Sequence, residues 1–136
     1  MNRDSAARDL ASASYQRCCD QPGFFEAFYR NFLAACPQAA PRFANTDFAR
    51  QNQLLRHAVG VLLIFPKQPD AEPTLLTRIA ERHSRRDLAV PAAMYPPFVD
   101  SLLATVKQYD SLFTPEVEAA WRRTVDKGVR YMVSRY

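Results

Sequence analysis

The stretch LLTRIAERHSRRDL (residues 75–88) contains the pattern on which the interpretation of the whole chain depends. Within it, Leu76, Ile79 and Ala80 recur at helical spacing, and His83 lies at the polar end of the same stripe. A histidine that faces inward from an apolar helix either closes the end of a hydrophobic core or binds a group held inside that core. The pattern alone leaves both interpretations open, so the surrounding sequence has to decide between them.

The composition predicts one domain over residues 1–136 with a substantial hydrophobic core. Hydrophobic residues make up 48% of the chain, and its nine phenylalanines would suit the walls of a cavity for a flat, apolar cofactor. The net charge of +4 comes from scattered basic residues. Because a nucleic-acid site would need a basic face interleaved with exposed aromatic side chains, we expect no nucleic-acid partner.

The sequence has no pattern typical of a membrane or exported protein. Its longest apolar run, AVGVLLIF (residues 58–65), is too short to span a bilayer, and residues 1–10 lack the apolar core of a secretory signal. We therefore expect a cytoplasmic protein with no membrane partner. In the cytoplasm Cys18, Cys19 and Cys36 would be free thiols. They form neither CxxC nor CxxCH, so neither a zinc site nor covalent haem attachment is indicated.

Proline residues divide the chain into helices, and no segment shows the alternation of a half-buried strand. Thr114, Pro115 and the acids that follow are typical of a helix start. The expected helices cover about residues 4–19, residue 24 onward, a cap at Thr46 or Asp47 to about residue 65, residues 72–84, and segments beginning at Pro91 or Pro96 and at Pro115. The predicted fold class is all-α, with about seven helices.

Two further polar side chains are candidates for the same interior as His83. Tyr29 lies in a phenylalanine-rich helix face, where its hydroxyl needs a partner that a nearby carbonyl would also supply. Gln51 precedes Leu55 by four residues, so both lie on one side of their helix, although a glutamine near a helix start is also readily solvated. His57 is a rival metal ligand, but helical geometry turns it away from the Gln51 side, so His83 is preferred.

Together these residues would form a haem pocket. His83 would bind the iron through one ring nitrogen, while a backbone carbonyl one turn earlier accepts a hydrogen bond from the other. Tyr29 and Gln51 would donate hydrogen bonds to a gas bound on the opposite side of the haem. One of Arg82, Arg85 and Arg86 would pair with a haem propionate, although each also fits a solvated basic turn. The residues predicted to contact the haem are Phe43, Leu55, Val59, Ile79, Leu88, Phe98 and Leu102.

The same residues carry a likeness to a known family. The segments FYRNFLAACPQAAPRFANTDFARQNQLLRHAV, LTRIAERHSRRDLAV, YPPFVDSLLATVKQYD and EVEAAWRR resemble the single-domain bacterial globins, which are related to the globin domains of flavohaemoglobins and globin-coupled sensors. The likeness runs from about Tyr15 to Tyr136.

This resemblance implies the globin fold around b-type haem. It also implies His83 as the proximal ligand, Phe43 as the haem-wedging residue and Tyr29 with Gln51 as the distal pair. The interval from Phe43 to the distal glutamine is shorter than in flavohaemoglobins, so Gln53 stays open as the alternative to Gln51. Tyr95 resembles a tyrosine that contacts the proximal histidine in that group, but the longer turn after His83 leaves this role open.

The expected function is reversible binding of O2, with NO and CO as related ligands, for oxygen transport, gas sensing or NO detoxification. NO dioxygenation would need a separate reductase, and sensing would need a signalling partner; otherwise the protein is a non-enzymatic oxygen binder. The alternative is a haem-free globin-fold module that acts through protein contacts. Retention of His83, Phe43, Tyr29 and Gln51 together favours the haem protein.

Overall fold

The computed structural model describes residues 3–65 and 75–136, and in these ranges the chain is almost entirely helical. Its elements are α1 (Arg3–Cys19), α2 (Phe24–Ala35), η1 (Pro37–Phe43), α3 (Phe48–Ile64), α4 (Leu75–His83), η3 (Ala92–Met94), α5 (Tyr95–Tyr109) and α6 (Pro115–Ser134), where η denotes a 3₁₀ helix. The predicted all-α fold class is confirmed. The predicted start of the fourth helix near residue 72 lies outside the described residues.

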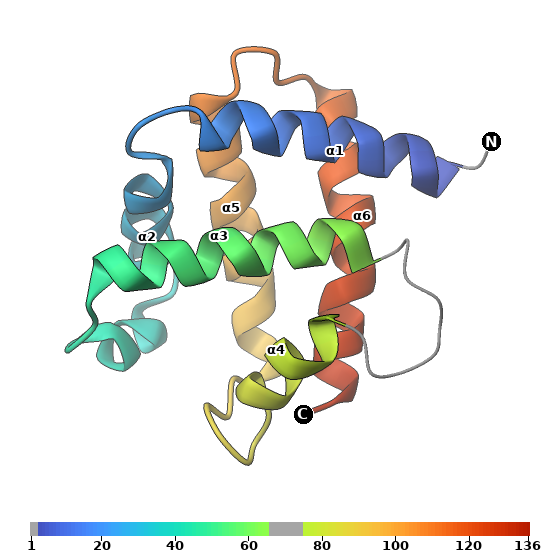
Figure 1. Ribbon diagram of the computed structural model, residues 1–136. Helices are drawn as coiled ribbons and strands as arrows, with labels where there is room; N and C mark the ends of the chain where they lie inside the picture. Colours follow the sequence, from blue (N-terminus) through green and yellow to red (C-terminus); the bar gives the residue numbers. More distant parts are fainter. Residues whose placement is uncertain (1–2, 66–74) are drawn as a thin grey trace.

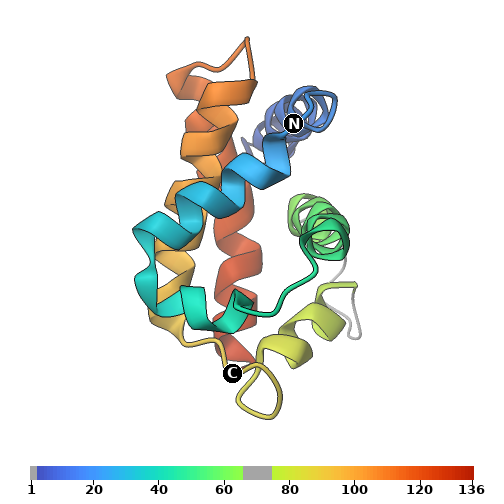
Figure 2. The ribbon, with the colours of Figure 1, turned by 90° about the vertical axis from the view of Figure 1, so that its left-hand side faces the viewer.

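The helices are arranged in two crossing directions. Figure 1 shows α1 and α3 running across α5 and α6, with α2 beside α5 and α4 below α3. α1 packs mainly against α6, α2 packs mainly against α5, and α4 contacts both α3 and α6. Figure 2, turned by 90°, shows α1 and α3 almost end-on, with α2 crossing α5. Steep crossings of this kind leave room between helices that a parallel bundle would fill.

Local sequence sets where these helices begin. Asp47 caps α3 by accepting hydrogen bonds from the backbone N–H groups of Ala49 and Arg50, at 3.1 and 3.4 Å. Of the two predicted caps, Thr46 and Asp47, the structure therefore selects Asp47. α5 begins at Tyr95, so Pro96 rather than Pro91 stands in its first turn. Thr114 caps α6 by accepting from the backbone N–H of Val117 at 3.2 Å, as predicted.

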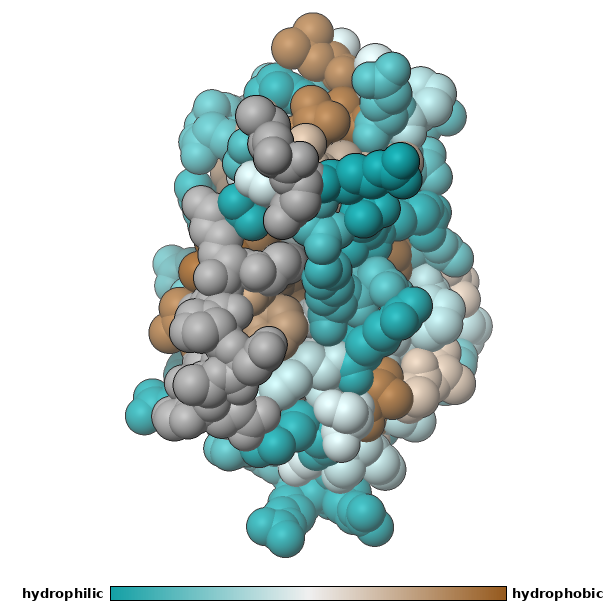
Figure 3. All heavy atoms as spheres, turned by 90° about the vertical axis from the view of Figure 1, so that its right-hand side faces the viewer, coloured by the Kyte–Doolittle hydropathy of each residue, from teal (hydrophilic) through white to brown (hydrophobic). Residues whose placement is uncertain are grey.

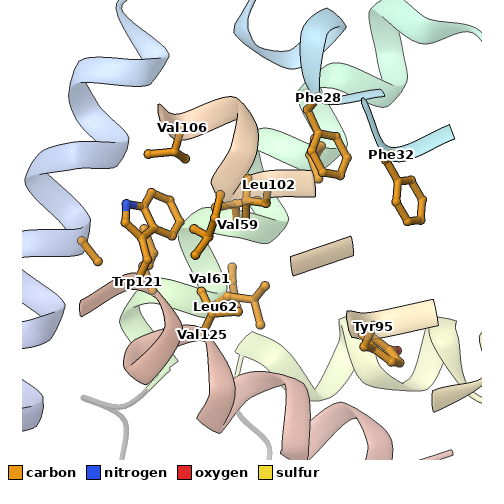
Figure 4. Packing of buried hydrophobic residues seen from close by; sticks show 14 of the residues in the cluster. Phe28, Phe32, Val59, Val61, Leu62, Tyr95, Leu102, Val106, Trp121 and Val125 are labelled. Carbon is orange, nitrogen blue, oxygen red and sulfur yellow. The ribbon is translucent and has the colours of Figure 1, made fainter. Parts of the chain in front are cut away.

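Trp121 is fully buried in the hydrophobic core (Figure 4). Its indole Nε1 donates to Ser14 Oγ at 2.9 Å, and Ser14 Oγ donates to the carboxylate of Asp110 at 2.6 Å. Arg17 donates to both oxygens of Asp110, at 2.5 and 2.9 Å. This buried network fastens α1 to α6 and to the end of α5, and it satisfies polar groups that would otherwise be costly inside the protein.

The surface is predominantly polar on the side toward which α6 and the start of α1 lie. Hydrophilic side chains cover most of that face, and the hydrophobic ones are scattered among them (Figure 3). None of the described helices is both long and apolar enough to cross a membrane.

We expect Asp110→Ala to lower the free energy of unfolding by about 3 kcal/mol, because Arg17 and Ser14 lose their buried acceptor. Asp100→Ala is the matched control: its partner Arg122 and its own carboxylate are both exposed, so the loss should stay within about 0.5 kcal/mol. Urea unfolding at neutral pH measures both. Equal losses in the two variants would contradict the role of the buried network.

The same network predicts a pH dependence. Burial raises the pKa of Asp110, but hydrogen bonds from Arg17 and Ser14 outweigh this effect and hold the pKa below its ordinary value. The charged carboxylate therefore stabilises the fold at neutral pH, and this contribution is lost as the pH falls below about 4. The difference in unfolding free energy between the wild type and Asp110→Ala should shrink over that range.

Candidate functional site

A cavity of about 840 Å³ opens between α2, η1, α3, α4, α5 and α6. Figure 2 shows α3 and α4 on one side of this region and α2 with α5 on the other. The volume is within the range of small-molecule and cofactor sites, and the walls are largely hydrophobic. Tyr29, Gln51 and His83, which are far apart in the sequence, all line this one cavity.

His83 is the last residue of α4, where its ring reaches the cavity. Its Nδ1 lies 2.7 Å from the backbone carbonyl of Ile79, one turn earlier, as predicted. Because a carbonyl can only accept, Nδ1 carries the hydrogen and Nε2 keeps a free lone pair. Burial lowers the pKa of His83, although the bond to Ile79 opposes this shift, so the ring is neutral at pH 7. A neutral imidazole with Nε2 free is the form that binds a metal.

Tyr29 and Gln51 form a hydrogen-bonded pair on the α2 and α3 side of the cavity. Gln51 Nε2 donates to the phenol oxygen of Tyr29 at 3.0 Å. Because the glutamine fills an acceptor position, the phenol keeps its own hydrogen for another partner. Burial raises the pKa of Tyr29 to about 12, so the hydroxyl stays protonated at neutral pH. Phe43 and Phe48 contact the same ring, with centroid distances of 5.5 and 5.4 Å.

The two glutamines left as alternatives on α3 lie in different places. Gln53 is exposed and does not line the cavity, whereas Gln51 lines it and reaches Tyr29. His57 was expected to turn away, yet it lines the cavity as an exposed residue. The cavity therefore contacts a broader part of the α3 surface than the side on which Gln51 lies.

Five of the seven predicted wall residues line the cavity: Phe43, Leu55, Ile79, Leu88 and Phe98. The other two, Val59 and Leu102, are fully buried and belong to the core behind the wall (Figure 4). For Val59 the reason is helical geometry. The cavity lies on the side of α3 that includes Gln51, Leu55, Ala58 and Leu62. Val59 is one residue, or about 100°, around from Ala58 and faces the packed core instead.

Several cavity residues were not anticipated from the sequence. Val129 and Met132, three residues apart on α6, line the cavity together with Met94. Arg42 and Arg50 line it as exposed residues, as does Arg82, whereas Arg85 and Arg86 do not. Arg42 directly precedes Phe43, and this position next to a predicted haem contact could have indicated that Arg42 also lines the cavity. The others depend on how the helices cross and have no local signature.

Tyr95 at the start of α5 also lines the cavity. Burial raises the pKa of its phenol to about 12. Within the described part of the chain no hydrogen bond joins Tyr95 to His83, whose Nδ1 is already occupied by the carbonyl of Ile79. The contact that the resemblance suggested for Tyr95 therefore stays a prediction.

The family model for globins matches residues 26–132, which include every candidate site residue. The chain belongs to the globin family. A crystal structure of a protein from Pseudomonas aeruginosa PAO1, described as structurally highly homologous to human haemoglobin, resembles this globin with a TM-score of 0.89 and 35% sequence identity. The similarity covers 96% of this chain and 98% of that one. No curated protein matches the chain.

Membership of the globin family implies haem as the prosthetic group, and the donor set of this globin fits it. The neutral imidazole of His83 faces the cavity with Nε2 free, which suits an iron whose other ligands come from the porphyrin. The aromatic rings of Phe28, Phe43 and Phe98 line the walls, as a flat apolar macrocycle requires. The exposed Arg82 at the cavity would suit the carboxylate end of the same molecule.

We expect the ring of His83 to be the Nδ1–H tautomer in the hemin-free globin at pH 7, because the carbonyl of Ile79 accepts from Nδ1. Nitrogen-15 chemical shifts in a long-range proton–nitrogen correlation spectrum distinguish the two neutral tautomers. His83→Gln removes one set of ring signals and so assigns it. An Nε2–H tautomer would contradict the arrangement described here.

Proposed function

We propose that this globin binds haem b through His83 and uses it to bind O2 reversibly, with NO and CO as related ligands. The observation that carries the proposal is that the hydrogen-bonded pair Tyr29–Gln51 and the oriented imidazole of His83 line one cavity. A purely structural core would not need both the Tyr29–Gln51 pair and the oriented imidazole, and neither would a globin that no longer binds its cofactor. When bound, haem would supply an iron that takes up a diatomic gas.

His83 would hold the iron from the α4 side. The hydrogen bond from Nδ1 to the carbonyl of Ile79 fixes the ring plane and the tautomer, so Nε2 is presented without rearrangement. The same bond increases the electron density that the imidazole can donate. Ile79 and Leu88 line the cavity close by in the sequence and would keep water from the ligand nitrogen.

Tyr29 and Gln51 would donate hydrogen bonds to the gas. Gln51 fixes the phenol oxygen of Tyr29, so the O–H hydrogen is available, and the amide of Gln51 has a second hydrogen of its own. An O2 ligand held there would carry partial negative charge, and donors in a low-dielectric cavity stabilise such charge more than donors in water. The pair therefore supports tight binding and slow release of oxygen.

Arg82 is the residue that we favour for a haem propionate among the three predicted candidates, because it lines the cavity and Arg85 and Arg86 do not. Arg82 also pairs with Asp87 at 3.5 Å, a contact between two exposed side chains that would yield readily to a carboxylate. The guanidinium of Arg85 instead lies over the ring of Tyr136, 5.9 Å from its centroid.

The same site chemistry would serve oxygen transport, gas sensing and NO detoxification. For NO dioxygenation the iron would need reduction after each turnover, so a separate reductase would be the partner. For sensing, a signalling protein would have to read the ligand state. Slow oxygen release favours the uses that keep oxygen bound over rapid delivery.

We expect the purified globin to show a strong Soret band with hemin, and the band should shift when the reduced protein is exposed to CO. His83→Gly should lose stable hemin retention, and added imidazole should restore the spectrum because it replaces the missing ligand. His57→Gly is the matched control and should keep the wild-type spectrum. If the wild type gives no Soret band with hemin, the haem-free signalling module becomes the leading function.

We expect Tyr29→Phe to leave haem bound and to speed oxygen release about tenfold, the factor that corresponds to one hydrogen bond of ordinary net strength. Stopped-flow displacement of oxygen by CO measures the rate. Tyr15→Phe is the control, because Tyr15 donates to the carbonyl of Arg56 and does not line the cavity. An unchanged release rate in Tyr29→Phe would remove the distal hydrogen bond from the proposal.

A further inference from the structure

Arg42 joins two parts of the cavity that are distant in the sequence. It lies on η1 directly before Phe43, and its guanidinium donates to the backbone carbonyls of Leu88 and Ala89, at 2.5 and 3.1 Å. Leu88 and Ala89 belong to the turn that follows His83. Arg42 and Leu88 both line the cavity, so the contact connects the Phe43 side to the His83 side at the cavity itself.

The backbone of the turn is shaped for this contact. Ala89 has a φ of 50°, in the left-handed region that residues with a Cβ seldom adopt. In extended backbone, successive carbonyls point in opposite directions, whereas a helical conformation of either hand turns them to the same side. The carbonyls of Leu88 and Ala89 can therefore both meet one guanidinium. A planar fork with several donors suits two neighbouring acceptors better than the single point charge of lysine.

The turn that contains Leu88 and Ala89 is hydrogen-bonded to the backbone of His83, the residue that would hold the iron. The backbone N–H of Val90 donates to the carbonyl of His83 at 3.0 Å, and the N–H of Ala89 donates to the carbonyl of Ser84 at 2.8 Å. A displacement of Leu88 and Ala89 would therefore be passed directly to the end of α4. Holding the turn in place also holds the backbone of His83.

We propose that Arg42 with the carbonyls of Leu88 and Ala89 forms a clasp that fixes the position of His83 relative to Phe43 and so slows the escape of haem. Arg42 is thus a positioning residue, which acts through the turn and not as a partner of the cofactor. The inference rests on the proposed haem function, because haem retention is what the clasp controls. A competing role for Arg42 is charge attraction to the haem carboxylates, and the two roles differ in how they respond to changes at Ala89.

The first experiment measures transfer of hemin from the holoprotein to excess apomyoglobin. We expect Arg42→Met, which keeps the aliphatic stem, to lose hemin about tenfold faster than the wild type. Arg42→Lys should fall between them because lysine reaches one carbonyl at a time. Ala89→Val should also accelerate the loss, since a β-branched residue disfavours the left-handed conformation while the charge of Arg42 stays. Arg30→Met, at an exposed arginine of α2 away from the cavity, should match the wild type.

These variants separate the two roles. Faster hemin loss in both Arg42→Met and Ala89→Val supports the clasp. Faster loss in Arg42→Met with a wild-type rate in Ala89→Val would overturn it, because charge alone would then explain the effect. Wild-type rates in both variants would also overturn it.

A second measurement does not depend on haem. In the hemin-free protein, the clasp should protect the amides of Leu88, Ala89 and Val90 from hydrogen exchange, and Arg42→Met should expose them while amides of α6 keep their wild-type rates. Unchanged exchange in the turn would overturn the clasp even if hemin loss changed. Failure of the wild type to hold hemin would contradict the proposed function, and the exchange data would still decide whether the clasp exists.

Discussion

A cavity of about 840 Å³ has to stay open inside a chain of 136 residues, and the remaining packing is organised around this constraint. Protein interiors normally pack as densely as organic crystals, because atoms that face a void lose their dispersion contacts. Here the buried core around Trp121 does not line the cavity, and the Ser14–Asp110 hydrogen bond ties α1 to the end of α5. Because the core is held together in this way, the space that α3, α4 and α5 enclose can stay open while the fold remains stable.

Three polar side chains on the cavity wall are fixed by hydrogen bonds within the protein before any ligand binds. Gln51 supports the phenol of Tyr29, the carbonyl of Ile79 supports His83, and the carbonyls of Leu88 and Ala89 support Arg42. The first two bonds each leave one group available to the cavity: the hydrogen of Tyr29 and Nε2 of His83. Binding therefore has little conformational entropy to lose, and preorganisation of this kind increases affinity without additional contacts.

What could be predicted from the sequence depended on how local each interaction is. The cap at Thr114 and the bond from His83 to Ile79 act within one helical turn, so spacing alone indicated them. Helical periodicity also found the inward face of α3, but it could not tell which part of the interior is hollow, and Val59 lies in the packed core instead of on the cavity wall. The partners of Arg42 are backbone carbonyls 46 and 47 residues away, which no side-chain pattern marks.

Trp121 is the one tryptophan of the sequence, and its surroundings make it an internal optical reporter. The indole is sealed from solvent, donates to Ser14, and meets the ring of Tyr15 edge-on with centroids 5.9 Å apart. Its emission therefore comes from a single buried site. Because porphyrins absorb at the wavelengths where indole emits, energy transfer to a bound haem would quench the fluorescence of Trp121. The fluorescence of the native chain would then follow occupancy of the cavity without any added label.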